Sequence, residues 1–332
     1  MATQRRRSAG GNVGRRRQWA TLLGVTGADA DDADDQFDLV PSHTHVDTVD
    51  KDVARSLCNY DVCQGWPLER LERERAKLSR IINRIMSRHA GHLHYIQGYH
   101  DICSVVLIAC DYDERLALAI CDRLSRVHLR EFLRPSLDVV VEVLNLLFPL
   151  LECLDPAVAR FLHRANIQSF FALSWVLTWF SHTIYKFDVV VRIFDFLIVS
   201  HPTMPLYIAA AFVHQHRGNL LRLECDMPAI HHYFQQQNEV DLDSVLPLAR
   251  ILYRRFPPRD LFRQYRPRIP LDSLLPRSDI GKLYSEGWPP STKPMSGFHT
   301  FPSVYSVNAV PMLLIAVWAI ILWQLLHYLT GS

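Results

Sequence analysis

Residues 68–91, LERLERERAKLSRIINRIMSRHAG, carry the folding signal that decides the class of this protein. Apolar residues return there at intervals of three or four, which places them on one face of a helix: Leu71, Leu78, Ile81, Ile82 and Ile85. Gly91 follows as a residue suited to end the helix, because glycine adopts left-handed backbone angles at little cost. The stretch therefore predicts one long amphipathic helix.

The same kind of pattern continues along most of the chain. Four more apolar runs are each long enough for a helix, at residues 136–154, 188–202, 206–218 and 241–258. The third run ends in Gly218, again a residue suited to end a helix. None of the thirteen glycines follows Asn or Asp, so the strongest short signal for a β-hairpin never occurs. We predict an all-α domain over residues 15–256, with one helix for each run.

The composition argues against several classes of protein. The chain has 332 residues, and 36 Lys and Arg stand against 34 Asp and Glu, a net charge of +2 that argues against a nucleic-acid binder. The seven cysteines are odd in number and include no Cys-x-x-Cys pair. This usage favours a reduced, cytosolic compartment over a disulfide framework or a zinc module.

The two ends of the chain differ from the helical domain. Residues 1–14 are polar and basic, and we expect them to be disordered rather than a signal peptide. Nine of the nineteen prolines fall in residues 257–306, which predicts a Pro-rich linker. The last expected segment is 307–329. Within it, residues 309–329 form an uncharged apolar run that, as a helix, is long enough to cross a hydrocarbon core of roughly 30 Å.

The apolar run predicts a C-terminal single-pass transmembrane helix, with a buried core helix as the alternative. Such a helix would insert residues 309–329 into the lipid bilayer and leave the preceding domain on the cytosolic side. A short span with few flanking charges suits a thin membrane of the early secretory pathway. We therefore expect an endoplasmic reticulum location, with the Golgi as the alternative.

Familiar catalytic motifs are missing from the sequence. It contains no GxxxxGK[ST] or GxGxxG phosphate loop, no HExxH or Cys/His zinc spacing, and no GxSxG nucleophile elbow. We therefore expect no bound nucleotide and no metal. His100 and Asp101 are residues of a kind found in catalytic triads, but no Ser or Cys partner is evident.

The stretch VDKDVARSL, residues 49–57, places Asp52 and Arg55 three residues apart, so that they are neighbours on a helix surface. One interpretation is an ordinary ion pair worth a few tenths of a kcal/mol. The other is that Asp52 holds the Arg55 guanidinium in place for the anion of a partner.

Three short signatures occur in order along the chain: Arg15-x-x-x-Trp19, Val49-x-x-Asp52-x-x-Arg55 and Tyr95-x-Gln97. In this order and spacing they resemble the RxxxW, IxxDxxR and YxQ fingerprint of the TBC-domain family of Rab GTPase-activating proteins, with Val49 in place of isoleucine. The likeness continues through residues 172–184, 189–213 and 225–234, and is greatest to a membrane-anchored member of the family.

The resemblance implies an all-helical TBC fold that binds a GTP-bound Rab and accelerates GTP hydrolysis, without a reaction of its own. Arg55 would act as an arginine finger that neutralises charge on the transferring phosphoryl group. Gln97 would act as a glutamine finger that orients the attacking water. GTP and Mg²⁺ would belong to the Rab, a protein of the early secretory pathway, and the setting would be vesicle-mediated transport.

The resemblance also implies supporting residues around the two fingers. Asp52 would orient Arg55, and Tyr95 would pack or hydrogen-bond beneath Gln97. Gly98 would let the backbone run close to the partner at the entrance of a helix, where its tolerance of unusual backbone angles matters.

Further residues have less direct expected roles. Arg15 and Trp19 would serve the fold near the face that carries the two fingers, and His100 and Asp101 would order the loop that carries the glutamine. Two other functions remain open at this point: a non-catalytic membrane-anchored scaffold that binds a Rab, and a hydrolase that uses His100 and Asp101.

Overall fold

The computed structural model describes residues 14–26 and 43–277, all of which belong to one compact unit, Met1–Glu286. Every regular element within these two ranges is a helix, so the prediction of an all-α domain is confirmed. Residues 14–22 are helical, and after them come α3 (Val46–Ala54), η2 (Asp61–Cys63), α4 (Leu68–Arg88), α5 (Tyr99–Ala109), α6 (Glu114–Arg126), α7 (Asp138–Leu144), α8 (Leu147–Leu154), α9 (Pro156–Arg164), η3 (Ser169–Ala172), α10 (Leu173–Leu177), α11 (Phe187–Ile198), α12 (Met204–Gln215), α13 (Arg217–Leu220), α14 (Met227–Gln235), α15 (Leu242–Arg255) and α16 (Pro258–Tyr265).

The long helix predicted from residues 68–91 is α4. Leu78, Ile81, Ile82 and Ile85 are buried along one face, as the spacing indicated, whereas Leu71 near the start of the helix is only half-buried. The helix ends at Arg88, and Gly91 lies three residues later with a φ of +82°, where it turns the chain toward α5.

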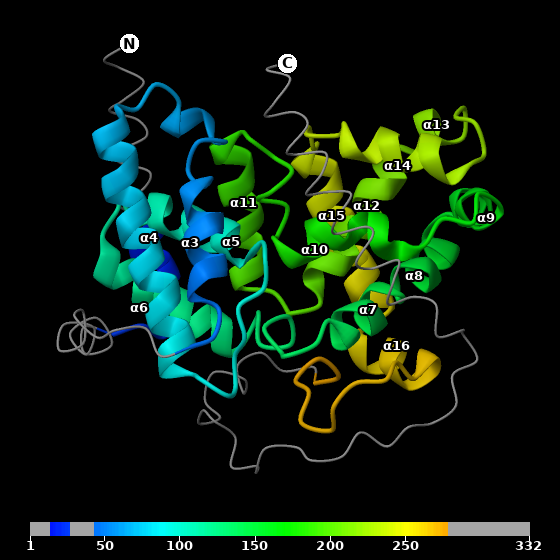
Figure 1. Ribbon diagram of the computed structural model, residues 1–332. Coiled ribbons are helices and arrows are strands. Elements are labelled where there is room, and N and C mark those ends of the chain that lie inside the picture. The colour runs from blue at the N-terminus through cyan, green and yellow to red at the C-terminus, as the bar shows by residue number, and fades with distance from the viewer. Residues whose placement is uncertain (1–13, 27–42, 278–332) are drawn as a thin grey trace. The chain divides into compact units, whose positions relative to one another are not determined.

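Two helices form the centres of two neighbouring groups (Figure 1). Every residue of α5 is buried, and α3, α4, α6 and α11 pack against it. The residues of α12 from Met204 to Val213 are buried as well, under α8, α10 and α15. Because α5 has no exposed face, the polar side chains at its first turn must find partners inside the protein.

Two local predictions were wrong. Residues 136–154 form α7 and α8 instead of one helix, because Pro149 has no N–H for the Asn145 carbonyl and its ring would collide with that carbonyl in a continuous helix. Gly218 does not end the run at 206–218: α12 stops at Gln215, and Gly218 lies inside the short α13.

The first residues of the predicted linker belong to the helical domain. Residues 257–277 pack on the domain: α16 starts with Pro258, a residue compatible with a first helical turn, and buries Leu261 and Phe262. Farther on, the Asp272 carboxylate pairs with Arg130 and Arg134. The ordered domain therefore extends past residue 256.

Other predicted segments lie outside the described residues. They are the basic segment 1–13, the rest of the linker at 278–306 and the transmembrane segment at 307–329. No described helix combines the length and the apolar character needed to cross a membrane.

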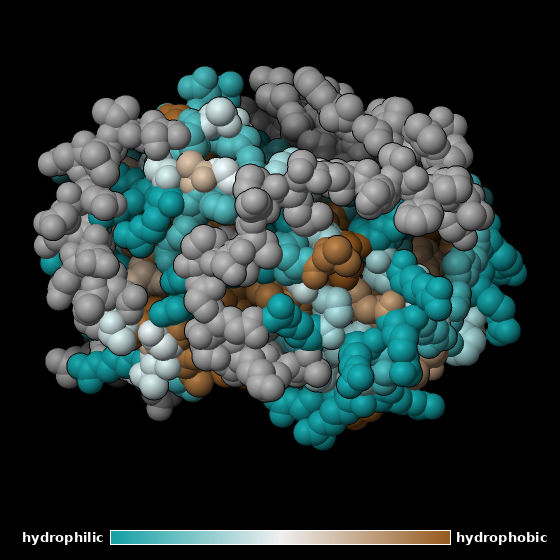
Figure 2. All heavy atoms as spheres, turned by 90° about the horizontal axis from the view of Figure 1, so that it is seen from below, coloured by the Kyte–Doolittle hydropathy of each residue, from teal (hydrophilic) through white to brown (hydrophobic). Residues whose placement is uncertain are grey.

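On the face that Figure 2 shows, most of the coloured surface is hydrophilic, and hydrophobic residues form separate patches within it. Nine large apolar residues of the described ranges are exposed: Leu22, Val62, Leu68, Tyr185, Val199, Met227, Ile251, Tyr265 and Leu271. Single exposed apolar residues are ordinary, so their meaning depends on what lies beside them.

Candidate functional site

The Asp52 carboxylate joins two of the sequence signatures. Arg55 Nη2 donates to Asp52 Oδ1 at 2.6 Å, and the Tyr95 hydroxyl donates to Asp52 Oδ2 at 2.7 Å. Burial and the Asp52 charge raise the pKa of Tyr95, so its phenol keeps the proton that it donates. Asp52 is buried, whereas 44% of the Arg55 side chain is exposed. The predicted contact is present, and a buried carboxylate here holds an exposed guanidinium.

The sequence of α3 produces this geometry locally. Val49 and Val53 are buried on the inner face of the helix. Asp52 and Arg55 are three residues apart, and Arg55 is the residue that follows the last turn. The chain then bends sharply at Leu57, which is buried with a φ of +66°. A buried leucine with left-handed angles is uncommon, and such strain often accompanies functional sites.

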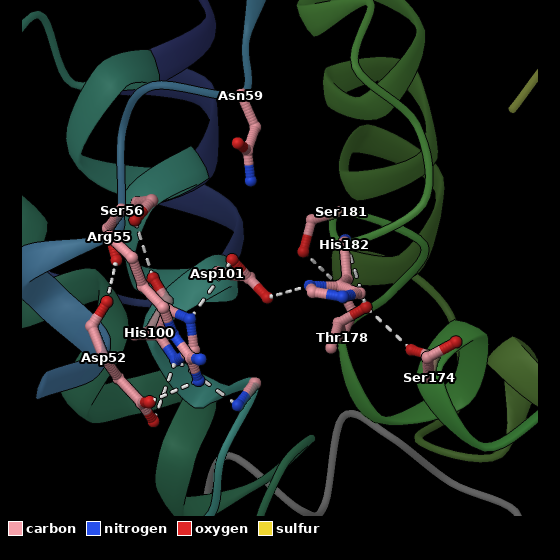
Figure 3. Close-up of polar contacts among 12 residues, drawn as sticks. Asp52, Arg55, Ser56, Asn59, His100, Asp101, Ser174, Thr178, Ser181 and His182 are labelled. Atoms are coloured by element: carbon pink, nitrogen blue, oxygen red, sulfur yellow. Dashed lines mark hydrogen bonds and ion pairs between the residues drawn. The ribbon is translucent and has the colours of Figure 1, made fainter. Parts of the chain in front are cut away.

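A series of polar contacts continues from Asp52 across the first turn of α5 (Figure 3). His100 Nδ1 lies 3.0 Å from the Tyr95 hydroxyl and 3.5 Å from Asp52 Oδ2. His100 Nε2 lies 3.4 Å from Asp101 Oδ1, and Asp101 Oδ2 lies 2.9 Å from His182 Nδ1. The polar network therefore connects the end of α3 with the loop that follows α10.

Charge stabilises the buried end of this network. Burial by itself would raise the pKa of Asp101. The His100 and His182 rings and the Arg55 guanidinium outweigh burial and lower the pKa of Asp101 to about 2. Burial lowers the pKa of His182, but the charge and the hydrogen bond of Asp101 outweigh it and raise that pKa. Asp101 and His182 thus favour each other's charged form.

Gly98 precedes α5 with a φ of +101°, a conformation that other residues adopt only under strain. A Cβ atom at this position would lie 2.8 Å from Thr178 Cγ2. The sequence reasoning assigned the close approach at Gly98 to a partner protein. In the structure Thr178 of the same chain makes a close approach there, so the glycine is needed for the domain's own packing, and the approach of a partner stays a prediction.

Gln97 occupies the turn between Tyr95 and α5 and is half-buried. Within the described part of the chain its amide has no hydrogen-bond partner. The amide therefore retains its capacity to bind a group outside the domain, and its catalytic role stays a prediction.

Arg15 and Trp19 lie at a different place in the domain. Arg15 Nε is 3.1 Å from Asp195 on α11, and Trp19 Nε1 donates to the same carboxylate at 2.7 Å. Trp19 is fully buried and stacks on Phe194 at 6.0 Å between ring centroids. These contacts agree with the expected role in the fold, but they are made with α11 and not with the residues around the two fingers. Among the described residues, no hydrogen bond or ion pair links either side chain to the polar network.

Sequence reasoning gave no role to His182 or Thr178. Both come from the turn after α10, in which Trp179 and Phe180 have φ angles of +53° and +65°. Burial of the two aromatic rings offsets the strain of this turn, which presents His182 to Asp101. The only sequence feature that could have indicated a role for His182 is its position as a single histidine within the apolar stretch WFSHTI.

The arrangement does not favour a hydrolase. His100 Nδ1 faces the Tyr95 hydroxyl, and its Nε2 faces Asp101. The nearby Ser104 hydroxyl donates to the His100 carbonyl at 2.7 Å instead of contacting the ring. His100 therefore lacks a nucleophile to activate among the described residues. In the same ranges, no group of three or more His, Cys, Asp or Glu residues is placed to hold a metal ion.

Comparison with known proteins identifies relatives of this chain. The Rab-GTPase-TBC domain family matches residues 14–221. The human protein TBC1 domain family member 20 is 36% identical over 251 residues, which cover 75% of this chain and 61% of that protein. GTPase-activating protein gyp10 of Schizosaccharomyces pombe is 35% identical over 156 residues, 47% of this chain and 41% of that protein.

The match covers only part of these relatives, since the chain spans about three fifths of the length of the human protein. A solved structure has the same fold. The crystal structure of the Ypt/Rab-GAP domain of Gyp1p superposes with a TM-score of 0.57 at 14% identity, covering 77% of this chain and 88% of that one.

Substitution Gly98→Ala should destabilise the domain strongly. The added methyl group would collide with Thr178, and a side chain is strained at this positive φ. Together these effects should lower the free energy of unfolding by about 2 kcal/mol or more. Gly91→Ala is the matched control, because Gly91 also has a positive φ but nothing within 4 Å of its Cβ position. Urea unfolding of both variants measures the difference, and equal losses would show that the Thr178 contact is unimportant.

The stability of the domain should fall in acid because of Asp101. Its pKa is about 2 in the folded protein against an ordinary 3.8, so its contribution is complete above pH 4. That contribution, about 2 kcal/mol, should disappear as the pH falls from about 4 to 2. Urea unfolding of the wild type and Asp101→Asn at several pH values tests this. The same acid dependence in both proteins would contradict it.

Proposed function

Because this chain belongs to the Rab-GTPase-TBC domain family, we propose that it accelerates GTP hydrolysis by a Rab, using Arg55 and Gln97 as fingers that enter the partner's nucleotide site. The observation that carries the proposal is the exposed Arg55 guanidinium, held at 2.6 Å by the buried Asp52 carboxylate. The name of the fission yeast relative, a GTPase-activating protein, supports the same activity.

Arg55 suits the proposed chemistry for a physical reason. Phosphoryl transfer depends mainly on positioning and on neutralising charge at the phosphoryl oxygens. A guanidinium is planar, always charged and able to donate from several N–H groups at once. Asp52 occupies one part of it through Nη2, and 44% of the Arg55 side chain is exposed. The contact therefore reduces the conformational freedom of the finger before the partner binds.

Gln97 would complete the site by holding the attacking water through its amide. Tyr95, two residues earlier, is hydrogen-bonded to Asp52, and Gly98, the next residue, is packed closely against Thr178. The turn that carries Gln97 is thus anchored on both sides. GTP and Mg²⁺ would be bound by the Rab, so this chain would need no cofactor and would have no reaction of its own.

The second candidate function is a non-catalytic scaffold that binds a Rab without accelerating hydrolysis. Such a protein needs neither a guanidinium oriented by a buried carboxylate nor a glutamine amide without a partner. The polar network from Asp52 to His182 therefore favours the activator.

We also propose that the protein acts on a membrane of the early secretory pathway, in vesicle-mediated transport. Residues 309–329 would anchor it in the endoplasmic reticulum membrane with the helical domain in the cytosol, and the Golgi is the alternative location. The uncharged run of apolar residues supports this proposal.

The catalytic proposal predicts the outcome of a GTP turnover assay with a panel of purified GTP-loaded Rabs. The wild-type protein should stimulate at least one Rab, and Arg55→Ala should reduce the stimulated rate by about 10³-fold. Gln97→Ala should also remove most of the stimulation. Arg263→Ala is the matched control, because it also removes an exposed arginine, but from a different helix, α16.

The three possible functions give different results in this assay. A scaffold would bind a GTP-loaded Rab without stimulating it, and a hydrolase would act with no Rab present. An Arg55→Ala protein that folds normally and retains full stimulation would refute the arginine finger.

The anchor proposal predicts the effect of deleting residues 309–332. The shortened protein should move from the membrane fraction to the soluble fraction, because the apolar span is gone. Its stimulation of a soluble Rab should stay unchanged. Continued sedimentation with membranes after alkaline carbonate extraction would contradict the anchor.

A further inference from the structure

We propose that two segments beside Arg55, residues 58–66 and 182–187, form a ledge that binds the GTP-bound Rab through Val62 and Tyr185. The inference rests on the proposed function and adds to it the surface that holds the partner in place. Val62 and Tyr185 belong to no sequence signature and no part of the polar network.

The ledge is continuous with the finger site. Residues 58–66 begin three positions after Arg55, and the Cys58 thiol contacts the Arg55 carbonyl at 3.2 Å. Residues 182–187 begin with His182, the last member of the polar network. In Figure 3 the Asn59 side chain points toward the region of Asp101 and His182. The ledge is therefore surface that a protein bound at Arg55 can also contact.

Backbone and side-chain bonds fix the two segments to each other. The Asp61 N–H donates to the Tyr185 carbonyl at 3.2 Å, and the Phe187 N–H donates to Asp61 Oδ1 at 3.0 Å. The Tyr60 hydroxyl donates to the Ser181 carbonyl at 3.1 Å. A surface that is already ordered loses less entropy when it binds, and this makes the ledge a suitable docking site.

Two large apolar side chains are exposed on this ordered surface. Val62 and Tyr185 are each 46% exposed, although the residues around them, Tyr60 and Phe187, are buried and in contact through their rings at 5.8 Å. Tyrosine is enriched among the residues that dominate binding energy, and apolar side chains around a charged group exclude water from it. The ledge thus offers apolar side chains on the two segments that adjoin Arg55 and the polar network.

The position of the ledge favours a GTPase as its occupant. The partner must bring its phosphates within hydrogen-bonding distance of Arg55. A stable interface of ordinary size buries roughly 800 Å² on each protein, so an interface that includes Arg55 extends over neighbouring surface. The segment that follows Arg55 and the loop that contacts the polar network lie in that neighbourhood.

Steady-state kinetics with the full chain tests the ledge, using the Rab that is stimulated most in the panel. Val62→Asp and Tyr185→Ala should each raise the KM for the GTP-loaded Rab by about tenfold, the size expected for a central contact residue. The kcat should stay within about twofold, because neither side chain reaches the phosphates. Arg55→Ala should show the opposite pattern, with a large loss of kcat.

Two substitutions of the same kinds serve as controls. Ile251→Asp changes a residue that is 58% exposed on α15, and Tyr265→Ala changes one that is 39% exposed on α16. Neither should change KM or kcat. Thermal unfolding of all four variants should match the wild type, since each altered side chain is exposed.

The outcomes separate the ledge from the catalytic proposal. Ledge variants with wild-type KM, or with a loss in kcat alone, refute the ledge even when Arg55→Ala is inactive. Light scattering that shows a wild-type dimer dissociated by Tyr185→Ala also refutes it, because the ledge would then bind a second copy of the chain. If the wild type stimulates no Rab, the proposed function fails and the ledge proposal fails with it.

Discussion

The Asp52 carboxylate, shared between Arg55 and Tyr95, is the interaction on which the arrangement of the site depends. A buried carboxylate is costly unless hydrogen bonds and opposite charge compensate for its lost hydration. Here one oxygen accepts from the guanidinium and the other from the phenol. These hydrogen bonds stabilise the buried carboxylate, and they also hold Arg55 at the end of α3 and Tyr95 in the segment that leads to Gln97.

The wall behind this site is built from residues far apart in the sequence. Thr178 occupies the space that a side chain at Gly98 would need. The next residue, Trp179, packs against Phe194 at 5.1 Å, and Phe194 stacks on Trp19 at 6.0 Å. The first sequence signature therefore supports the site indirectly, by packing behind the wall on which the turn before α5 rests.

This architecture suits a protein whose proposed partner holds the nucleotide. The domain would contribute two side chains at its surface, and everything beneath them restricts their motion. Asp52 orients Arg55, and the fixed neighbours of Gln97 limit the turn that carries it. Catalytic groups that are ordered before the reaction need little reorganisation during it, and this is the main benefit that protein structure gives to phosphoryl transfer.

The sequence by itself determined the helical class, the buried face of α4 and the Asp52–Arg55 contact, because each depends on residues one or two helical turns apart. Composition was a weaker guide, since the prolines after residue 256 begin α16 instead of a linker. Only the tertiary structure decided that His182 meets Asp101 and that Thr178 requires Gly98. Those contacts join residues about eighty positions apart in the sequence. Whether such residues meet depends on how α5 packs between other helices, and local periodicity does not encode that packing.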